Sequence, residues 1–295
     1  MDGALSYRRI GIVGTGRVAS AIGLALADRS AEPLALWGRD PGRSASVSAS
    51  IGRACLVPRL ADIAGTCDLI LLAVADDAIG QCVTDLAAAA AVSGTEGRFV
   101  FHVSGRSGAA ILAPLAARGW LTAAIHPAMT FTGDPPAEVR QMVGARFAVT
   151  GSTDEARAAG RAIVACLGGV PVEVAEDYRA LYHAALCHGA NHLVTLIAGS
   201  CEALAAAGVD DPAALLAPLV RAALENGLGK GMAGLSGPLL RGDEETIAGH
   251  IAALRRDCPQ LLPPYRAMAL ATLDALDRRD GTARSACRSL LEQAR

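Results

Sequence analysis

Short apolar runs alternate with helix-like stretches over the first half of the chain. Seven runs are predicted to be strands, at residues 9–13, 33–37, 68–74, 99–103, 121–125, 146–150 and 171–174. The run at 68–74 is apolar on both faces, which is typical of a parallel strand covered by helices on both sides. Residues 19–27 and 153–167 have the spacing of helices. The alternation predicts an α/β fold with a doubly wound sheet.

The pattern changes near Glu176, and no strand is predicted beyond it. Five helices are expected instead: 178–207, one from Asp211-Pro212, one from Asp243, one that Pro263-Pro264 opens or interrupts, and 282–293. A length of 295 residues fits two domains at ~150 residues each. We therefore expect an α/β domain over residues 1–175 and an all-α domain over residues 176–295.

Composition narrows the class of protein. Hydrophobic residues make up 52% of the chain, which is enough to bury a core, and the net charge of −2 argues against nucleic acid or an acidic membrane surface as partner. The apolar runs are shorter than the ~18–20 residues that a bilayer requires. Glycines and Arg17 interrupt the N-terminal apolar stretch, so no targeting segment is expected. Eight cysteines without a CxxC pair indicate a reducing, cytoplasmic environment.

A glycine-rich motif follows the first predicted strand and opens a helix. The segment Gly14-Thr15-Gly16-Arg17-Val18-Ala19 has the pattern GxGxxA. Gly14 permits a tight turn, Gly16 lets the backbone approach a pyrophosphate, and Ala19 keeps the helix close to the strand. The phosphates then meet N–H groups at the helix N-terminus. We expect a dinucleotide to bind here, through Gly14, Thr15, Gly16, Arg17 and Val18.

The end of the second strand indicates which dinucleotide binds. Sites that prefer NAD usually carry an acidic residue here, whereas this chain has Arg39, followed by Arg43 and Ser44. An arginine fork matches the 2′-phosphate of NADP. Asp40 is either the cap of the next helix or a ligand of the ribose. The pattern favours NADP.

Three further strand ends carry candidate residues. Val74 and Ala75 follow the third strand and are expected to line the cofactor site, since ligands bind outside the carboxyl ends of parallel strands. Asp76 or Asp77 is expected to cap the next helix. Ser104 would stand near the nicotinamide. His126 either bonds to backbone as a loop histidine or forms a polar wall of the nicotinamide or substrate site.

The basic residues are unevenly divided. Of 27 lysines and arginines, only Lys230 is a lysine. It lies in Gly229-Lys230-Gly231-Met232, without the Ser or Thr of a P-loop, so phosphate binding of that type is excluded. Every role that requires a lysine falls on Lys230 or on no residue. We expect Lys230 to be a solvated loop residue.

The motifs together resemble one family along nearly the whole chain. The segments GIVGTGRVASAIG, LLAVADDAI, HVSGRSGAAIL, HPAMTF, YHAALCHGANHLVTL and LSGPLLRGD resemble a group of Rossmann-like oxidoreductases whose C-terminal helical domain is poorly characterised. That group is similar to ketopantoate reductases, and more distantly to pyrroline-5-carboxylate reductases and 3-hydroxyacid dehydrogenases. The resemblance implies a Rossmann-like domain, NADP, and a helical domain that binds substrate and forms a homodimer.

Ketopantoate reductases place a lysine and two asparagines at four-residue spacing on the first helix of the helical domain. When the last asparagine is anchored on Asn191, Cys187 takes the middle position and His183 the position of the lysine. The chain therefore departs from the family pattern. His183 can serve instead as general acid, because imidazole titrates near neutral pH. Asn191 can hold a carboxylate or carbonyl group. The alternative is a stripe that bonds between helices or faces solvent.

Other polar residues of the helical half are candidates for binding a metal or a substrate. His188 and His192 have the spacing of metal ligands, but no HExxH glutamate lies between them, so no metal is predicted. In this family a loop such as Ser236-Gly237-Pro238 with Arg241 approaches the substrate, so Ser236 and Arg241 can bind an anion. The alternative is an ordinary turn followed by a helix cap at Asp243.

These observations predict an NADPH-dependent reductase of a small carbonyl compound, with a 2-oxo acid such as ketopantoate as the substrate. The catalytic candidates are His183, Asn191 and Ser104, and the substrate-binding candidates are His126, Asn191, Ser236 and Arg241. Two alternatives stay open. One is an imine reductase that resembles pyrroline-5-carboxylate reductase, and the other is a non-catalytic NADP-binding sensor, which the missing lysine favours.

Overall fold

The computed structural model describes residues 6–93, 97–281 and 284–294. The chain forms two compact units that divide between Cys187 and His188. Residues 176–187, which the sequence assigns to the helical domain, belong to the first unit because Glu176 and Arg179 bond to loops of its sheet. The domain limits of 1–175 and 176–295 stay a prediction.

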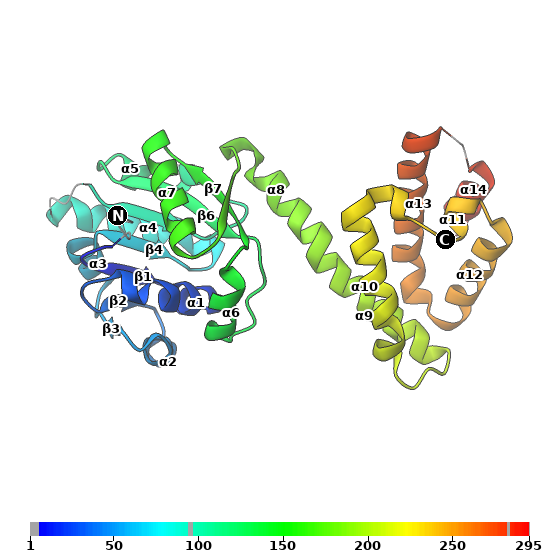
Figure 1. Ribbon diagram of the computed structural model, residues 1–295, viewed down its shortest axis with the longest axis horizontal. Helices are drawn as coiled ribbons and strands as arrows, with labels where there is room; N and C mark the ends of the chain where they lie inside the picture. The colour runs from blue at the N-terminus through cyan, green and yellow to red at the C-terminus, as the bar shows by residue number, and fades with distance from the viewer. Residues whose placement is uncertain (1–5, 94–96, 282–283, 295) are drawn as a thin grey trace. The chain divides into compact units, whose positions relative to one another are not determined.

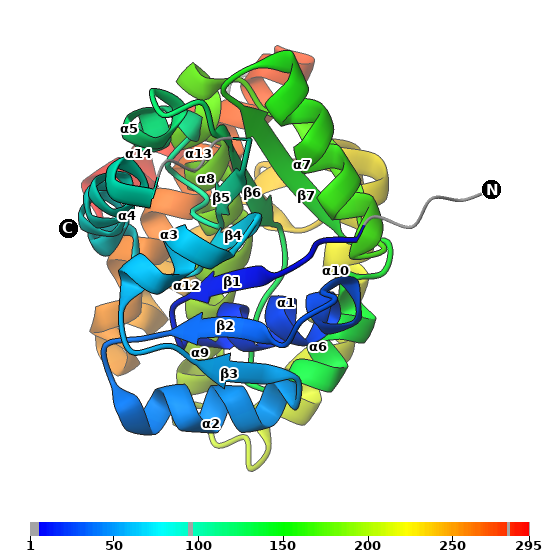
Figure 2. The same ribbon diagram turned by 90° about the vertical axis from the view of Figure 1, so that its left-hand side faces the viewer.

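An eight-stranded sheet organises the first unit (Figure 2). Its order is β3-β2-β1-β4-β5-β6-β7-β8, and every neighbouring pair is parallel except β6 with β7. The strands are β1 (Ile10–Val13), β2 (Leu34–Trp37), β3 (Ala54–Leu56), β4 (Leu69–Leu72), β5 (Phe99–His102), β6 (Leu121–Pro127), β7 (Arg146–Gly151) and β8 (Val170–Glu173). The predicted α/β class is confirmed. The sequence missed β3, whose three residues are too few to set up a period.

Helices cover both faces of this sheet (Figures 1 and 2). One face carries α1 (Arg17–Leu26), α2 (Pro41–Ile51), α6 (Pro135–Met142) and α7 (Asp154–Cys166), and the other α3 (Leu60–Thr66), α4 (Ile79–Ser93) and α5 (Ala113–Ala116). Successive strand residues point to opposite faces. Leu69 and Leu71 therefore enter one core, and Ile70 and Leu72 enter the other. This is why the run at 68–74 is apolar throughout.

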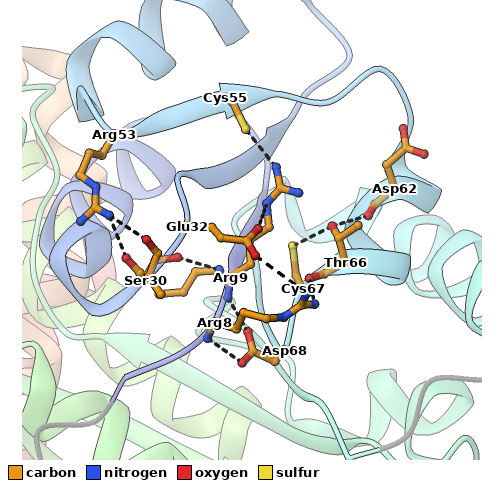
Figure 3. A network of polar contacts seen from close by, with 12 residues as sticks. Arg8, Arg9, Ser30, Glu32, Arg53, Cys55, Asp62, Thr66, Cys67 and Asp68 are labelled. Atoms are coloured by element: carbon orange, nitrogen blue, oxygen red, sulfur yellow. Dashed lines mark hydrogen bonds and ion pairs between the residues drawn. The ribbon is translucent and has the colours of Figure 1, made fainter.

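A polar network ties the amino ends of the strands together (Figure 3). The Asp68 carboxylate accepts hydrogen bonds from the backbone N–H groups of Arg8 and Arg9, each at 2.9 Å. The Arg9 guanidinium donates to Cys55 Sγ at 3.0 Å. These contacts join the entries of β1, β3 and β4. They leave the carboxyl ends of the strands as the edge where a ligand of a parallel sheet binds.

The second unit is helical in the residues that the structure describes. Its helices are α9 (His192–Ala206), α10 (Pro212–Lys230), α11 (Pro238–Arg241), α12 (Glu244–Asp257), α13 (Leu262–Asp280) and α14 (Ser285–Gln293). Its core forms where α12, α13 and α14 meet, around Ile247, Leu273 and Leu291. No described helix combines the length and the apolarity needed to cross a bilayer.

Several helix ends follow the prediction. Asp211 caps α10 and Asp243 caps α12, each by accepting a hydrogen bond from a backbone N–H of the first turn. The pair Pro263-Pro264 opens α13 and does not interrupt it. The predicted start of the last helix, Thr282, lies outside the described residues. The sequence missed the short helix α11.

Of two predictions for the helical half, one is confirmed and one is wrong. The long helix expected at 178–207 is present without a break over residues 179–206, as α8 (Arg179–Leu186), a π-helical turn (Cys187–Asn191) and α9, and a 3₁₀ turn (Glu176–Tyr178) precedes it. Gly189, a weak helix former, lies inside the π turn. Lys230 is not a loop residue: it ends α10, and its exposed Nζ donates to Asn226 Oδ1 at 3.1 Å.

Candidate functional site

A pocket of about 370 Å³ opens at the carboxyl ends of β1, β2 and β4. Seven of the predicted cofactor-binding residues line it: Gly14, Thr15, Gly16, Arg39, Arg43, Val74 and Ala75. They come from three separate loops, which the order β2-β1-β4 makes adjacent. The far wall is the first two turns of α4, with Gln81 and Cys82, which the sequence did not indicate.

The glycine motif has the backbone conformation that the sequence predicted. Gly14 has φ +123°, and a Cβ there would lie 2.1 Å from the Ala73 carbonyl oxygen at the end of β4. Gly16 has φ −84°, and a Cβ there would meet no atom within 4 Å. No side chain caps α1 at Gly16. The N-terminus of α1 therefore opens on the pocket with its N–H groups available to an anion.

The arginines after β2 lie on the opposite side of the pocket. Asp40, which also lines it, caps α2 by accepting the Arg43 backbone N–H at 3.0 Å, so its capping role is confirmed. Ser44 is buried, and its Oγ donates to the Asp40 carbonyl at 2.7 Å, so its role in cofactor binding stays a prediction. The side chain of Val18 is partly buried against the core, and its role in cofactor binding stays a prediction.

A second group of polar residues gathers beyond the ends of β5 and β6. His126 Nδ1 lies 2.9 Å from the Tyr182 hydroxyl of α8, and the rings of His126 and His183 are 6.1 Å apart edge to face. Both histidines border Gly105, where a Cβ would lie 2.5 Å from His183 Cδ2. The fold thus brings Ser104, His126 and His183 together, from three distant parts of the sequence.

Arg179 joins this cluster to the loops beneath it. Its side chain is 1% exposed, and its guanidinium donates to the carbonyl oxygens of Ser104, Ser107 and Ala148. The guanidinium also lies over the Tyr182 ring, 5.5 Å from its centre. No sequence motif indicated a role for Arg179 or Tyr182. The available signal was their position on the predicted helix, one turn or less from His183.

Burial determines the protonation of His126 and His102. Desolvation, followed by the positive charge of Arg179, lowers the pKa of His126 to about 4, so this ring is neutral near pH 7. Desolvation likewise lowers the pKa of His102 to about 4. Neutral His102 accepts the Ser104 N–H at Nδ1 and donates to the Gly108 carbonyl from Nε2. His102 therefore fixes the loop that carries Ser104.

The aspartates after β4 do not act as expected. Neither Asp76 nor Asp77 caps the next helix: the position before the 3₁₀ turn is Ala75, without a side-chain cap. The Asp76 carboxylate accepts instead from Arg106 Nε at 2.9 Å. Ser104 itself is buried, and its hydroxyl accepts the Ser107 N–H at 3.1 Å. The loop after β5 is thus held by one hydrogen bond to the loop after β4 and by one within itself.

The remaining candidates lie elsewhere. Arg17, at the start of α1, donates to the Phe131 carbonyl at 3.1 Å. Asn191, Ser236 and Arg241 belong to the second unit, where all three are exposed, and their substrate-binding roles stay predictions. The rings of His188 and His192 meet with their Nδ1 atoms 3.1 Å apart. Within the described ranges no third metal-ligating side chain joins them.

Comparison with family models divides the chain in two. Residues 4–127 match the Rossmann-like domain, and residues 145–272 match a domain of unknown function, DUF2520. The resemblance to Rossmann-like proteins with a poorly characterised helical domain is therefore confirmed. Comparison with curated proteins gives no match.

Several solved structures share this fold. A candidate NADP oxidoreductase from Bacteroides fragilis has a TM-score of 0.71 at 18% identity, over 90% of this chain and 97% of its own. A reductive aminase from Aspergillus terreus, in complex with NADPH and ethyl-5-oxohexanoate, has a TM-score of 0.67 at 18% identity, over 98% of this chain and 100% of its own. An imine reductase from Myxococcus stipitatus, in complex with NADP⁺, has a TM-score of 0.67 at 16% identity, over 97% of this chain and 100% of its own.

Proposed function

We propose that this chain, which joins a Rossmann-like domain to a DUF2520 domain, is an NADP(H)-dependent oxidoreductase that reduces a small C=O or C=N compound. The observation that carries the proposal is the pocket between the glycine loop and the two arginines. A pyrophosphate fits the uncapped N-terminus of α1, and a 2′-phosphate fits Arg39 and Arg43. The similar solved structures in complex with NADPH or NADP⁺ support the same cofactor.

Arg39 gives a direct test of the cofactor preference. Arg39→Ala is expected to weaken NADPH binding about tenfold or more and to leave NADH binding nearly unchanged, because only NADPH carries the 2′-phosphate. Fluorescence titration of both cofactors measures this. Arg140→Ala, on the exposed face of α6, is the control for the loss of one positive charge. Unchanged preference in Arg39→Ala would disprove the assignment.

The expected position of the substrate follows from the order of the strands in the sheet. Ligands of such sheets extend along the carboxyl ends of the strands, from the glycine loop toward the loops after β4 and β5. The nicotinamide supplies the hydride when it is bound. His183 then donates a proton to the oxygen or nitrogen of the reduced bond, and neutral His126 with Tyr182 binds the polar end of the substrate. Ser104 shapes the wall through its backbone, which His102 and Arg179 hold.

Two substrate classes remain. A 2-oxo acid is the first, and the ketopantoate named by the family resemblance is one such acid. A cyclic imine is the second, and the structural likeness to an imine reductase and a reductive aminase favours it weakly. An imine is protonated more easily than a ketone, so it depends less on the acid that replaces the missing lysine.

The function is tested by following NADPH absorbance at 340 nm with a panel of 2-oxo acids and cyclic imines. Oxidation of NADPH with any member supports the reductase and selects its class. Tight NADPH binding without turnover across both classes would favour the alternative, a non-catalytic NADP-binding sensor.

We also propose a homodimer formed through the helical unit. No residue of α10 is buried, although leucines occur on opposite sides of it: Leu215 and Leu219 on one, Leu224 and Leu228 on the other. A helix that is apolar all round is normally buried. A second copy of the chain can cover this surface. The eight free thiols agree with a cytoplasmic location, which is part of the same proposal.

Leu219→Glu tests the dimer. Light scattering is expected to give twice the chain mass of 30.0 kDa for the wild type and the chain mass itself for the variant, because the glutamate would be buried without a partner. Leu56→Glu, at an exposed leucine of β3, is the control. A monomeric wild type would disprove the dimer.

A further inference from the structure

Arg179 is a buried cation without a carboxylate in contact. Its side chain is 1% exposed, and its guanidinium donates hydrogen bonds to three backbone carbonyl oxygens. Within the described ranges no Asp or Glu forms an ion pair with it. The nearest acid along the chain, Glu176, uses both carboxylate oxygens to accept the N–H groups of Ala109 and Ala110. Carbonyl dipoles therefore hold the guanidinium, and the Glu176 carboxylate acts on it only from beyond ion-pair distance.

This charge lies directly behind the substrate end of the site. The guanidinium stacks over the Tyr182 ring at 5.5 Å, and the Tyr182 hydroxyl contacts His126 Nδ1 at 2.9 Å. The same guanidinium donates to the carbonyl of Ser104, next to the Gly105 that both histidines border. Arg179 is thus one side chain away from the polar surface that faces the substrate.

Other charges near His126 do not cancel this effect. The groups that influence it are Arg179 and His183 of α8, His102 of β5 and Asp76 after β4. Among them Arg179 has the largest effect on the pKa of His126, and Asp76, the one acid, acts more weakly in the opposite direction. Asp76 is also paired with Arg106 at 2.9 Å. Arg179 is therefore the strongest charge acting on His126, and it is positive.

We propose that Arg179 is a positioning residue whose buried charge selects the substrate: the site prefers a compound with a negative charge, such as a 2-oxo acid anion, over a neutral analogue or an iminium cation. The inference rests on the proposed reductase function and narrows its substrate class. An anion is attracted to this region, and so is the oxyanion that develops when a ketone accepts hydride. An iminium cation is repelled.

The test uses one pair of probes and one pair of variants. 2-Oxobutanoate and its methyl ester share the reacting ketone and differ in charge. Arg179→Lys and Arg179→Gln both retain donors for the carbonyl oxygens, but only the lysine retains the charge. The measured quantity is the ratio of kcat/KM for the acid to that for the ester. We expect a ratio of about ten or more in the wild type and Arg179→Lys, and about one in Arg179→Gln.

A second readout separates charge from structural support. In NMR titrations the pKa of His126 is expected to rise in Arg179→Gln and to stay low in Arg179→Lys, whereas loss of structure would raise it in both. Arg140→Gln controls for net charge. An unchanged ratio in a folded Arg179→Gln, or a wild type that prefers the ester or a protonated cyclic imine, overturns the proposal.

The outcome can be distinguished from failure of the reductase function itself. If neither probe is turned over, binding of each to the NADP⁺-loaded protein is followed through the ring signals of His126 and His183. If the wild type and Arg179→Lys bind the acid more tightly than the ester, and Arg179→Gln does not, the charge selection is supported even without catalysis. Binding of neither probe, or of both equally, overturns it, while NADPH affinity measured separately reports on the cofactor site.

Discussion

Gly16→Ala is expected to fold normally and to lose at least tenfold in NADPH affinity. A Cβ at this position meets no protein atom within 4 Å, and the backbone, at φ −84°, suits any residue. The methyl group instead occupies the space at the N-terminus of α1 where the pyrophosphate must approach the backbone. A tenfold loss corresponds to about 1.4 kcal/mol of binding free energy.

Gly14→Ala provides the contrast. Its Cβ would lie 2.1 Å from the Ala73 carbonyl oxygen, and the residue has φ +123°, so both the turn and the β1–β4 contact must change. We expect a loss of roughly 3 kcal/mol in the free energy of unfolding. Gly65→Ala, in α3 with open space around its Cβ, is the matched control. Urea unfolding and NADPH titration on all three variants separate the effects. Full NADPH affinity in Gly16→Ala would contradict the cofactor site.

His183→Ala is expected to lower kcat about a hundredfold and to leave NADPH affinity unchanged. The side chain lies beside Gly105 and His126 and does not line the pocket of the glycine loop and the two arginines, where we propose that the cofactor binds. Its loss removes the proposed proton donor, and general acids typically contribute 10²–10⁴-fold. His126 cannot replace it as a cationic acid, because burial lowers the pKa of His126 to about 4. Stopped-flow measurement of NADPH oxidation on the best substrate of the panel gives kcat.

The chain contains a matched control for this variant. His250 contacts the Tyr265 hydroxyl at 2.9 Å, with the rings edge to face, and lies on α12 of the second unit. Like His126, it is a histidine in contact with a tyrosine hydroxyl, but it belongs to no part of the proposed site. His250→Ala should therefore retain full activity. Full activity in His183→Ala would remove His183 from the mechanism and shift attention to Tyr182.

Sequence patterns predicted the fold class well, and the reasons are local. The glycine motif, the apolar strand runs and the caps at Asp211 and Asp243 each depend on a few consecutive residues. The misses depend on distant ones. The strand β3 exists because Ala54–Leu56 pairs with β2. Asp76 leaves the capping position because Arg106, which is thirty residues away, offers a better partner.

The candidate site divides in the same way. The glycine loop is recognisable from a few consecutive residues, because a tight turn requires glycine at 14 and a close approach of the backbone to a pyrophosphate requires it at 16. The arrangement at the proposed substrate end depends on contacts between distant segments. There, β5, β6 and α8 converge to bury Arg179 and to place Tyr182 against His126. Burial and the loss of water give those side chains their charge state and partners, and neither is encoded in any short stretch of sequence.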